Sequence, residues 1–294
     1  MLSNHFHLIL RTRPDVVATW SDEEVAKRWL LLCPHRRGTD GHALTPTQPE
    51  ILSIAGCPVK REEIRKRLSS ISWWMRLLCQ RTAIRANRED EETGRFFQDR
   101  YKATRLVDEA GLLACAAYVD LNPIRAAMCE TLQQSDHTSV QRRIESLQED
   151  QKSTQVGDQS TQGDTPSKTQ CDGFLSPLSL DELLDPLGPD ESRLPQRCSD
   201  KGFLAMPLQD YLELLDWTAR QTVHGKRGRT PEHVPPLLKR LGLDAAGWCE
   251  LVSDFGKLFC TVAGSAQAVD SMRSERTHRR YHLRRRAREL MSAG

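Results

Sequence analysis

The sequence predicts an α+β domain, a polar linker and an all-helical C-terminal region. Residues 2–10 (LSNHFHLIL) are short, apolar and able to alternate between two faces, which is typical of a strand, and residues 95–103 (RFFQDRYKA) are a plausible second strand. Between and after them, apolar residues recur every three or four positions, which is typical of helices. Residues 148–173 are mainly Gln, Ser, Thr, Asp and Gly without an aromatic residue, which predicts a disordered linker.

Three segments follow from this pattern, and their charges differ. Residues 1–145, the α+β core with an insertion at about 13–60, carry 22 basic and 19 acidic side chains. The acidic linker, residues 146–199, carries 4 and 10, and the helical region, residues 200–294, carries 16 and 11. Two mildly basic blocks around an acidic middle permit a nucleic-acid partner without establishing one.

The composition narrows the class of protein. The chain has 294 residues, 38% of them hydrophobic, and no apolar run approaches the roughly 18 residues of a membrane span. Nine cysteines occur singly and never at CxxC spacing, which favours reduced thiols over a zinc or redox site. Residues 1–5 lack the basic start and apolar run of a secretory signal, so we expect a cytoplasmic protein.

The remaining elements are expected in the following order. A helix over 22–32 follows the capping box Ser21–Glu24, then a loop over 33–60, a helix over 62–88, the strand over 95–103 and a helix that Asp108 caps and that continues to 121. In the C-terminal region we expect helices over 208–221, 234–241 and 245–259. Residues 237–251 fit a helix-turn-helix or a plain bundle. Seven arginines over 276–288 fit a nucleic-acid-binding tail or an exposed helix end.

His5 and His7 flank Phe6 in the first predicted strand. Because successive side chains of a strand point to opposite faces, both imidazoles would share one side while Phe6 packs behind them. Two nitrogen donors on a rigid strand suit a divalent metal that keeps open positions for a phosphate oxygen. The same pattern also fits two exposed polar residues, so both interpretations stay open at this point.

Tyr118 is the candidate nucleophile, and Asn122 lies four residues later on the same helix face. A phenol is a poor nucleophile at its usual pKa of about 10. A nearby metal helps by polarising the attacked phosphate and by stabilising the phenolate. The alternative is a core tyrosine next to an ordinary helix start, because Asn followed by Pro is common there.

Three blocks in this order resemble a known family. The segments LSNHFHLIL, GRFFQDRYKA and AYVDLNPIRAAM are similar to the matching blocks of HUH single-tyrosine transposases, and most similar to the branch associated with repetitive extragenic palindromes in the insertion-sequence-200-like group. The resemblance covers residues 1 to about 145. It implies a ferredoxin-like antiparallel sheet with helices, and a DNA transposase that acts on single-stranded DNA with hairpin ends, possibly as a homodimer.

The resemblance also implies roles for individual residues. His5 and His7 would bind Mg²⁺ or Mn²⁺, and Asn122 would be a further metal ligand. Tyr118 would attack the scissile phosphate, form a 5′-phosphotyrosine link and free a 3′-hydroxyl. A 3′-hydroxyl of another strand could then reverse the step without ATP.

Basic and aromatic side chains are candidates for DNA contacts. Those that could neutralise backbone phosphates are Arg76, Arg81, Arg85 and Arg88 on the long helix and Arg95, Arg100 and Lys102 on the second strand. Those that could stack on unpaired bases are Trp73, Trp74, Phe96 and Phe97. The alternatives are a solvated helix face for the basic residues and a packed core for the aromatic ones.

The chain departs from the family pattern in two ways. Family members carry a strand and a helix before the HUH strand, so the resemblance implies a copy that lacks this first strand and helix. Residues 13–60 are longer than the connection in compact members, and fit either an insertion that positions DNA or a surface elaboration. Two rival functions stay open, a catalytically inactive or domesticated protein that only binds DNA hairpins, and a metal-dependent nuclease in which water replaces tyrosine.

Overall fold

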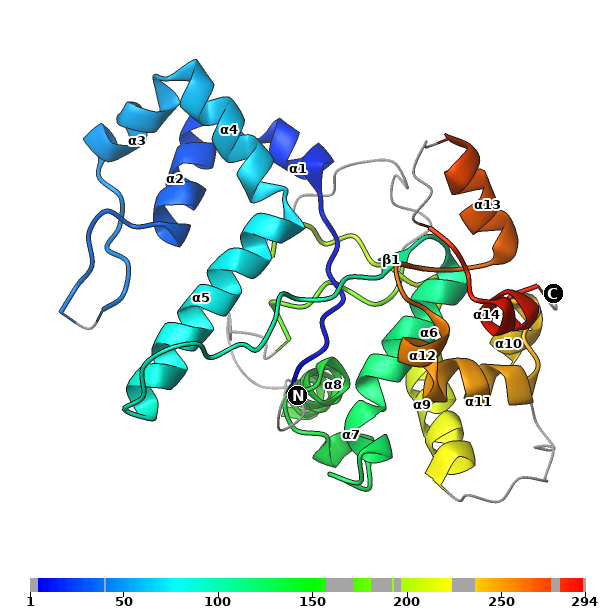
Figure 1. The fold of residues 1–294 in the computed structure, drawn as a ribbon. Coiled ribbons are helices and arrows are strands. Elements are labelled where there is room, and N and C mark those ends of the chain that lie inside the picture. The colour runs from blue at the N-terminus through cyan, green and yellow to red at the C-terminus, as the bar shows by residue number, and fades with distance from the viewer. Residues whose placement is uncertain are drawn as a thin grey trace. The chain divides into compact units, whose positions relative to one another are not determined.

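The computed structural model describes residues 5–39, 41–156, 172–180, 192, 197–223, 236–275 and 281–292 (Figure 1). Of these residues, 58% are helical. The chain divides into two compact units, one made of Met1–Ile9, Ala103–Pro186 and Leu194–Gly294, the other of Leu10–Lys102 and Leu187–Arg193. The first is called the tyrosine unit below, because it contains Tyr118, and the second the arginine unit.

The expected ferredoxin-like antiparallel sheet is wrong. In the described residues the strands form a single two-stranded parallel sheet, in which β1 (Arg105–Leu106) pairs with β2 (Val262–Ala263). The two segments expected to be strands, of which residues 5–10 and 95–103 are described, have irregular backbone. Alternating apolar residues show only which side chains can be buried, whereas a strand also needs a neighbour for its backbone hydrogen bonds. Neither segment has one.

Among its described residues, the arginine unit contains five helices. They are α1 (Pro14–Thr19), α2 (Asp22–Leu32), α3 (Gln48–Ala55), α4 (Pro58–Leu68) and α5 (Ile71–Glu89). The expected helix over 22–32 is confirmed, and the Ser21 hydroxyl caps it by accepting a hydrogen bond from the Glu24 amide at 3.1 Å. Val16, Val25 and Leu30 are almost fully buried and form the small core of this unit.

Two predictions for the arginine unit are wrong, and the residues that cap its helices explain why. The expected loop over 33–60 contains α3 and the start of α4, because Thr47 and Glu50 form a capping box that starts α3. The expected single helix over 62–88 is two helices, separated at Ser69 and Ser70. The Ser70 hydroxyl accepts from the amide of Trp73 and so starts a new helix instead of continuing the old one.

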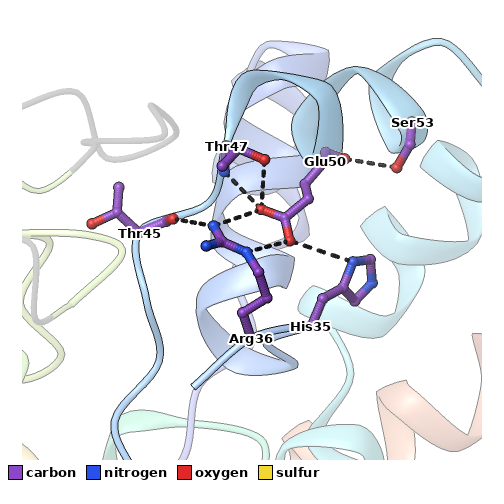
Figure 2. Close-up of polar contacts among 6 residues, drawn as sticks. All are labelled: His35, Arg36, Thr45, Thr47, Glu50 and Ser53. Atoms are coloured by element: carbon purple, nitrogen blue, oxygen red, sulfur yellow. Dashed lines mark hydrogen bonds and ion pairs between the residues drawn. The ribbon is translucent and has the colours of Figure 1, made fainter. Parts of the chain in front are cut away.

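Figure 2 shows how Glu50 ties the preceding loop to α3. Its carboxylate accepts from the Thr47 amide and hydroxyl, both at 2.8 Å, and from two guanidinium nitrogens of Arg36, both at 3.1 Å. The Arg36 guanidinium also donates to the Thr45 carbonyl at 3.1 Å. Arg36 and Thr47 together hold the pKa of Glu50 down at about 2. This cluster is a structural clamp, because each of these contacts joins two parts of the same loop and helix.

Tryptophan rings of α2 and α5 contact each other and arginine guanidinium groups of α4 and α5. The Trp29 and Trp73 rings lie 6.1 Å apart, centroid to centroid. The guanidinium carbon of Arg67 lies 4.3 Å from the Trp73 ring centroid, and that of Arg76 lies 5.0 Å from it. Such cation–π contacts stabilise a half-buried ring. They supplement a small core, to which α5 contributes only one buried residue, Met75.

The tyrosine unit contains the remaining described elements. Besides β1 and β2 they are α6 (Glu109–Asp120), α7 (Asn122–Arg125), the 3₁₀ helix η1 (Leu132–Gln134), α8 (Ser139–Val156), α9 (Leu208–Val223), α10 (Pro236–Arg240), α11 (Ala245–Ser253), α12 (Phe255–Leu258), α13 (Ala266–Glu275) and α14 (Arg285–Leu290). The core lies between α6, α9 and α11, where Leu113, Tyr211 and Trp248 are at most 1% exposed. Residues that precede the predicted linker and residues that follow it therefore contribute to one core.

Several helices of the tyrosine unit differ from expectation. The disordered linker was predicted to start at residue 148, which is wrong because α8 continues through residues 148–156. Residues 157–171 lie outside the described part. Helix α9 confirms the expected helix over 208–221. The expected helix over 245–259 is interrupted at Asp254 between α11 and α12. The expectation for 234–241 is met by α10, with residues 234–235 outside the described part.

Asp108 fixes the amino end of α6, as the sequence predicts. Its carboxylate accepts from the Gly111 amide at 2.9 Å, and also from the Ser265 amide after β2. Gly111 allows β2 to come close, because a Cβ at this position would lie 2.8 Å from the Ala263 carbonyl oxygen. One carboxylate therefore joins α6 to the far end of the chain.

Candidate functional site

The candidate site is centred on Tyr118, a half-buried residue near the end of α6. The His7 ring packs edge-on against the Tyr118 ring, with centroids 5.1 Å apart. The His5 ring lies 5.0 Å from the His7 ring. The fold thus brings together three residues from opposite ends of the expected core, although residues 5–10 do not form the expected strand.

A buried polar network holds α6 in place behind Tyr118. Asp120 is fully buried and accepts from the Ser139 hydroxyl on α8 at 2.6 Å and from the Tyr211 hydroxyl on α9 at 2.8 Å. Burial raises the pKa of Asp120, while these two donors and the nearby Arg143 oppose the shift. Burial and the contact with Asp120 raise the pKa of Tyr211 well above its ordinary value. Three helices are therefore linked through one carboxylate, and this fixes the position of the Tyr118 backbone.

The histidine pair fits a divalent ion in part. The Nε2 atom of His7 is buried and has no hydrogen-bond partner within the described residues. Such an atom calls for a ligand that the protein itself does not supply. Burial, followed by the charges of His5 and Arg125, lowers the pKa of His7 and so favours the neutral ring that can bind a metal. The separation of the two rings is compatible with both binding one ion, since a metal–nitrogen bond is about 2.1 Å long.

Asn122 does not complete this pair as it stands. It is buried at the start of α7, and its side-chain oxygen accepts a hydrogen bond from Arg125 at 2.9 Å. The oxygen would have to leave this guanidinium before it could bind an ion. Within the described ranges, no three His, Cys, Asp or Glu residues cluster so as to hold a metal. The site therefore offers two nitrogen donors, and any further ligands would be water or substrate oxygens.

Arg125 belongs to the site, although the sequence reasoning did not single it out. Its guanidinium carbon lies 4.3 Å from the centroid of the Tyr118 ring. The same guanidinium donates to the carbonyls of Val252 and Ser253 at the end of α11. Burial lowers the pKa of Arg125, and the nearby Tyr118 and Asp254 oppose the shift. Spacing alone does not identify it, because α6 ends at Asp120, Arg125 lies on the separate helix α7, and its acceptors are on α11.

The C-terminal region supplies another side of the site. The Phe255 ring lies 5.5 Å from the Tyr118 ring, and a Cβ at Gly256 would lie 3.5 Å from the Tyr118 hydroxyl. Sequence reasoning missed both residues because nothing local connects α12 with α6. Only the packed structure reveals this contact.

The candidate DNA-binding residues all lie in the arginine unit, and the basic ones among them are exposed. The structure places Arg76, Arg81 and Arg85 on α5, and Arg95, Arg100 and Lys102 on the segment that follows it. That segment runs back along α5, because the side-chain amide of Asn87 donates to the Gly94 carbonyl at 3.1 Å and the Tyr101 and Ser72 hydroxyls lie 3.1 Å apart. The basic residues therefore lie on two adjacent stretches of chain, α5 and the return segment.

Not all of these side chains are free to bind a phosphate. Arg85 forms an ion pair with Glu89 at 2.7 Å, Arg81 donates to the Leu32 carbonyl, and Arg76 lies over Trp73. Among the aromatic candidates, Trp74 and Phe96 are each 45% exposed. Trp73 contacts two guanidinium groups, which leaves less of its ring for a base.

Comparison with family models, curated proteins and solved structures gave no match to this chain. No helix within the described residues combines the length and the apolar character needed to cross a membrane.

Proposed function

We propose that this protein is a DNA transposase that cleaves and rejoins single-stranded, hairpin-bearing DNA through Tyr118. The observation that carries the proposal is the contact between His7 and Tyr118, whose ring centroids lie 5.1 Å apart. It supports the proposal because a metal-binding imidazole and a nucleophilic phenol must act on the same phosphate. A cytoplasmic location and a homodimer belong to the same proposal.

In the proposed reaction the Tyr118 oxygen attacks phosphorus. The bond between this oxygen and phosphorus forms while the bond from phosphorus to the 3′ oxygen of the DNA breaks. The phenol loses its proton, and the leaving 3′ oxygen ends as a hydroxyl, so that charge and atoms balance. The 5′-phosphotyrosine keeps the energy of the broken phosphodiester, and attack by a 3′-hydroxyl of another strand restores it.

His5 and His7 would hold Mg²⁺ or Mn²⁺, which when bound would neutralise charge on the phosphate oxygens. The chain itself contributes position and charge. Asp120 fixes the helix that carries Tyr118, and Arg125 places a positive charge beside the Tyr118 ring. A fixed cation next to the attacked phosphate stabilises charge that develops in the transition state.

The test is a covalent adduct between the full chain and a labelled single-stranded hairpin oligonucleotide that resists detergent. We expect it to form in Mg²⁺ or Mn²⁺, to be absent in EDTA and to disappear in Tyr118→Phe. Tyr101→Phe is the matched control, since it removes a hydroxyl from an exposed tyrosine of the other unit. An adduct that persists in Tyr118→Phe would assign the nucleophile to another residue.

A second candidate is a catalytically inactive protein that only binds DNA hairpins. The observation that favours it is the hydrogen bond from Arg125 to Asn122, which occupies the expected third metal ligand. Hairpin binding that persists in EDTA, without an adduct in either metal, would support this alternative over the first.

A further inference from the structure

The junction between α11 and α12 lies against Tyr118, although it belongs to the C-terminal helical region. Val252 and Ser253 accept hydrogen bonds from Arg125, whose guanidinium covers the Tyr118 ring. Three residues further on, the Gly256 backbone approaches the Tyr118 hydroxyl itself. One short stretch of chain therefore fixes the ring and also borders the atom proposed to react.

Gly256 has no conformational reason to be glycine. It lies inside α12, and it is absent from the glycines with positive φ. Glycine destabilises a helix relative to alanine, so its presence there needs another explanation. The Tyr118 hydroxyl, at 3.5 Å, is the single atom within 4 Å that a Cβ would meet. In the described structure, the missing side chain does one thing, which is to leave space at that hydroxyl.

The chain next to this space lies at the surface of the unit. Gly256 is exposed, as are its neighbour Lys257 and Ser253 on the preceding helix. Tyr118 is half-buried, and Phe255 and His7 pack against its ring. A ligand that approaches the hydroxyl past Gly256 therefore passes a residue that carries no side chain.

We propose that the α11–α12 junction, residues 252–256, is a wall of the Tyr118 site, and that Gly256 keeps open the path by which a phosphate group reaches the tyrosine hydroxyl. The identity of the ligand rests on the proposed function. The path does not, since it follows from the contacts of Arg125 and from the space at Gly256. The proposal thereby assigns the C-terminal region a part in the site that was not expected from the sequence.

Chemical modification tests the path without any DNA. N-acetylimidazole transfers an acetyl group to an accessible tyrosine oxygen and releases imidazole, and peptide mass spectrometry then reports each of the four tyrosines. Tyr101 is 42% exposed and Tyr211 is 1% exposed, so they serve as internal positive and negative controls. We expect acetylation of Tyr118 to slow several-fold in Gly256→Ala, and further in Gly256→Leu, with Tyr101 unchanged.

Lys257→Ala is the matched control on the same helix, since its side chain is 84% exposed and points to solvent. It should leave acetylation of Tyr118 at the wild-type rate. Gly256→Ala should fold normally, because a contact at 3.5 Å is an ordinary van der Waals distance. Equal Tyr118 acetylation in wild type, Gly256→Ala and Gly256→Leu would overturn the proposal. So would a wild-type Tyr118 as unreactive as Tyr211.

Adduct formation with the hairpin oligonucleotide gives the second readout. We expect it to fall several-fold in Gly256→Ala, whose Cβ only narrows the path, and by about a hundredfold in Gly256→Leu, because a larger side chain there would displace the reacting atoms and a shift of about 1 Å can cost that much. If the wild type forms no adduct, the proposed function fails, while acetylation still decides on the path. If it forms an adduct that both Gly256 variants match, the path fails and the proposed function stands.

Discussion

Helices α5 and α6 have similar sequence signals but opposite structural roles. Both show apolar residues at helical spacing, yet α5 buries one of its 19 residues and α6 buries six of its 12. The difference lies in the residues that accompany the large apolar side chains, which include four arginines in α5 and four alanines in α6. Alanine lets neighbouring helices approach closely, whereas arginine keeps them apart and presents charge. One helix forms a surface, and the other holds a single side chain in a fixed place.

The largest expected effect breaks the support of α6. Asp120→Ala leaves the Tyr211 and Ser139 hydroxyls without their acceptor and removes the charge near the buried Arg143. We expect the free energy of unfolding to fall by about 3 kcal/mol, as for other buried polar pairs that lose one partner. Urea denaturation followed by circular dichroism measures it. Arg85→Ala on α5 is the comparison, and should change stability by less than about 0.5 kcal/mol. Equal effects of the two changes would refute the contrast between the helices.

A middle-sized effect is expected where α5 joins the rest of its unit. Trp73→Ala removes a ring that packs on Trp29 and contacts Arg67 and Arg76, and should cost about 2 kcal/mol of stability. Trp74→Ala changes the neighbouring tryptophan, which is 45% exposed, and should cost well under half as much. Thermal unfolding of the two variants compares them directly. A larger loss for Trp74 would show that the described contacts of α5 are not those that stabilise it.

The smallest expected effect depends on pH and sharpens the description of the arginine unit. Arg36 and Thr47 lower the pKa of Glu50 from 4.5 to about 2 in the folded state. A lowered folded pKa means that the contribution of Glu50 is present above pH 4.5 and is lost as the pH falls from there to about 2. We expect the melting temperatures of wild type and Glu50→Gln to differ slightly at pH 6 and to converge near pH 2. A constant difference across this range would remove Glu50 as its cause.

Sequence reasoning succeeded where the determining interactions are local. Ser21 and Asp108 cap helices within a few residues, so their positions could be inferred from the chain alone. It failed where a distant partner decides the outcome. Residues 5–10 carry an alternating pattern that fits a strand, but no strand in the described part of the chain pairs with them, and His7 instead packs its ring on Tyr118. Alternation specifies two faces and says nothing about what covers either of them.

The candidate site divides in the same way. Tyr118 and the two histidines could be selected from residue type and spacing. Arg125 was overlooked because its acceptors, Val252 and Ser253, lie in a region that follows a long polar stretch. Gly256 could not have been found at all, since only the distance to the Tyr118 hydroxyl gives it meaning.

The absent side chain of Gly111 has a consequence for any attempt to dissect this chain. Backbone from β2 rests directly where a Cβ would otherwise stand, 2.8 Å from the Ala263 oxygen. The first turn of α6 is thus shaped to receive a segment from near the end of the polypeptide, and Asp108 bonds to that segment as well. A fragment ending before the polar stretch would carry the tyrosine on a helix whose first turn had lost its covering, so the tyrosine unit is best studied with both of its sequence halves present.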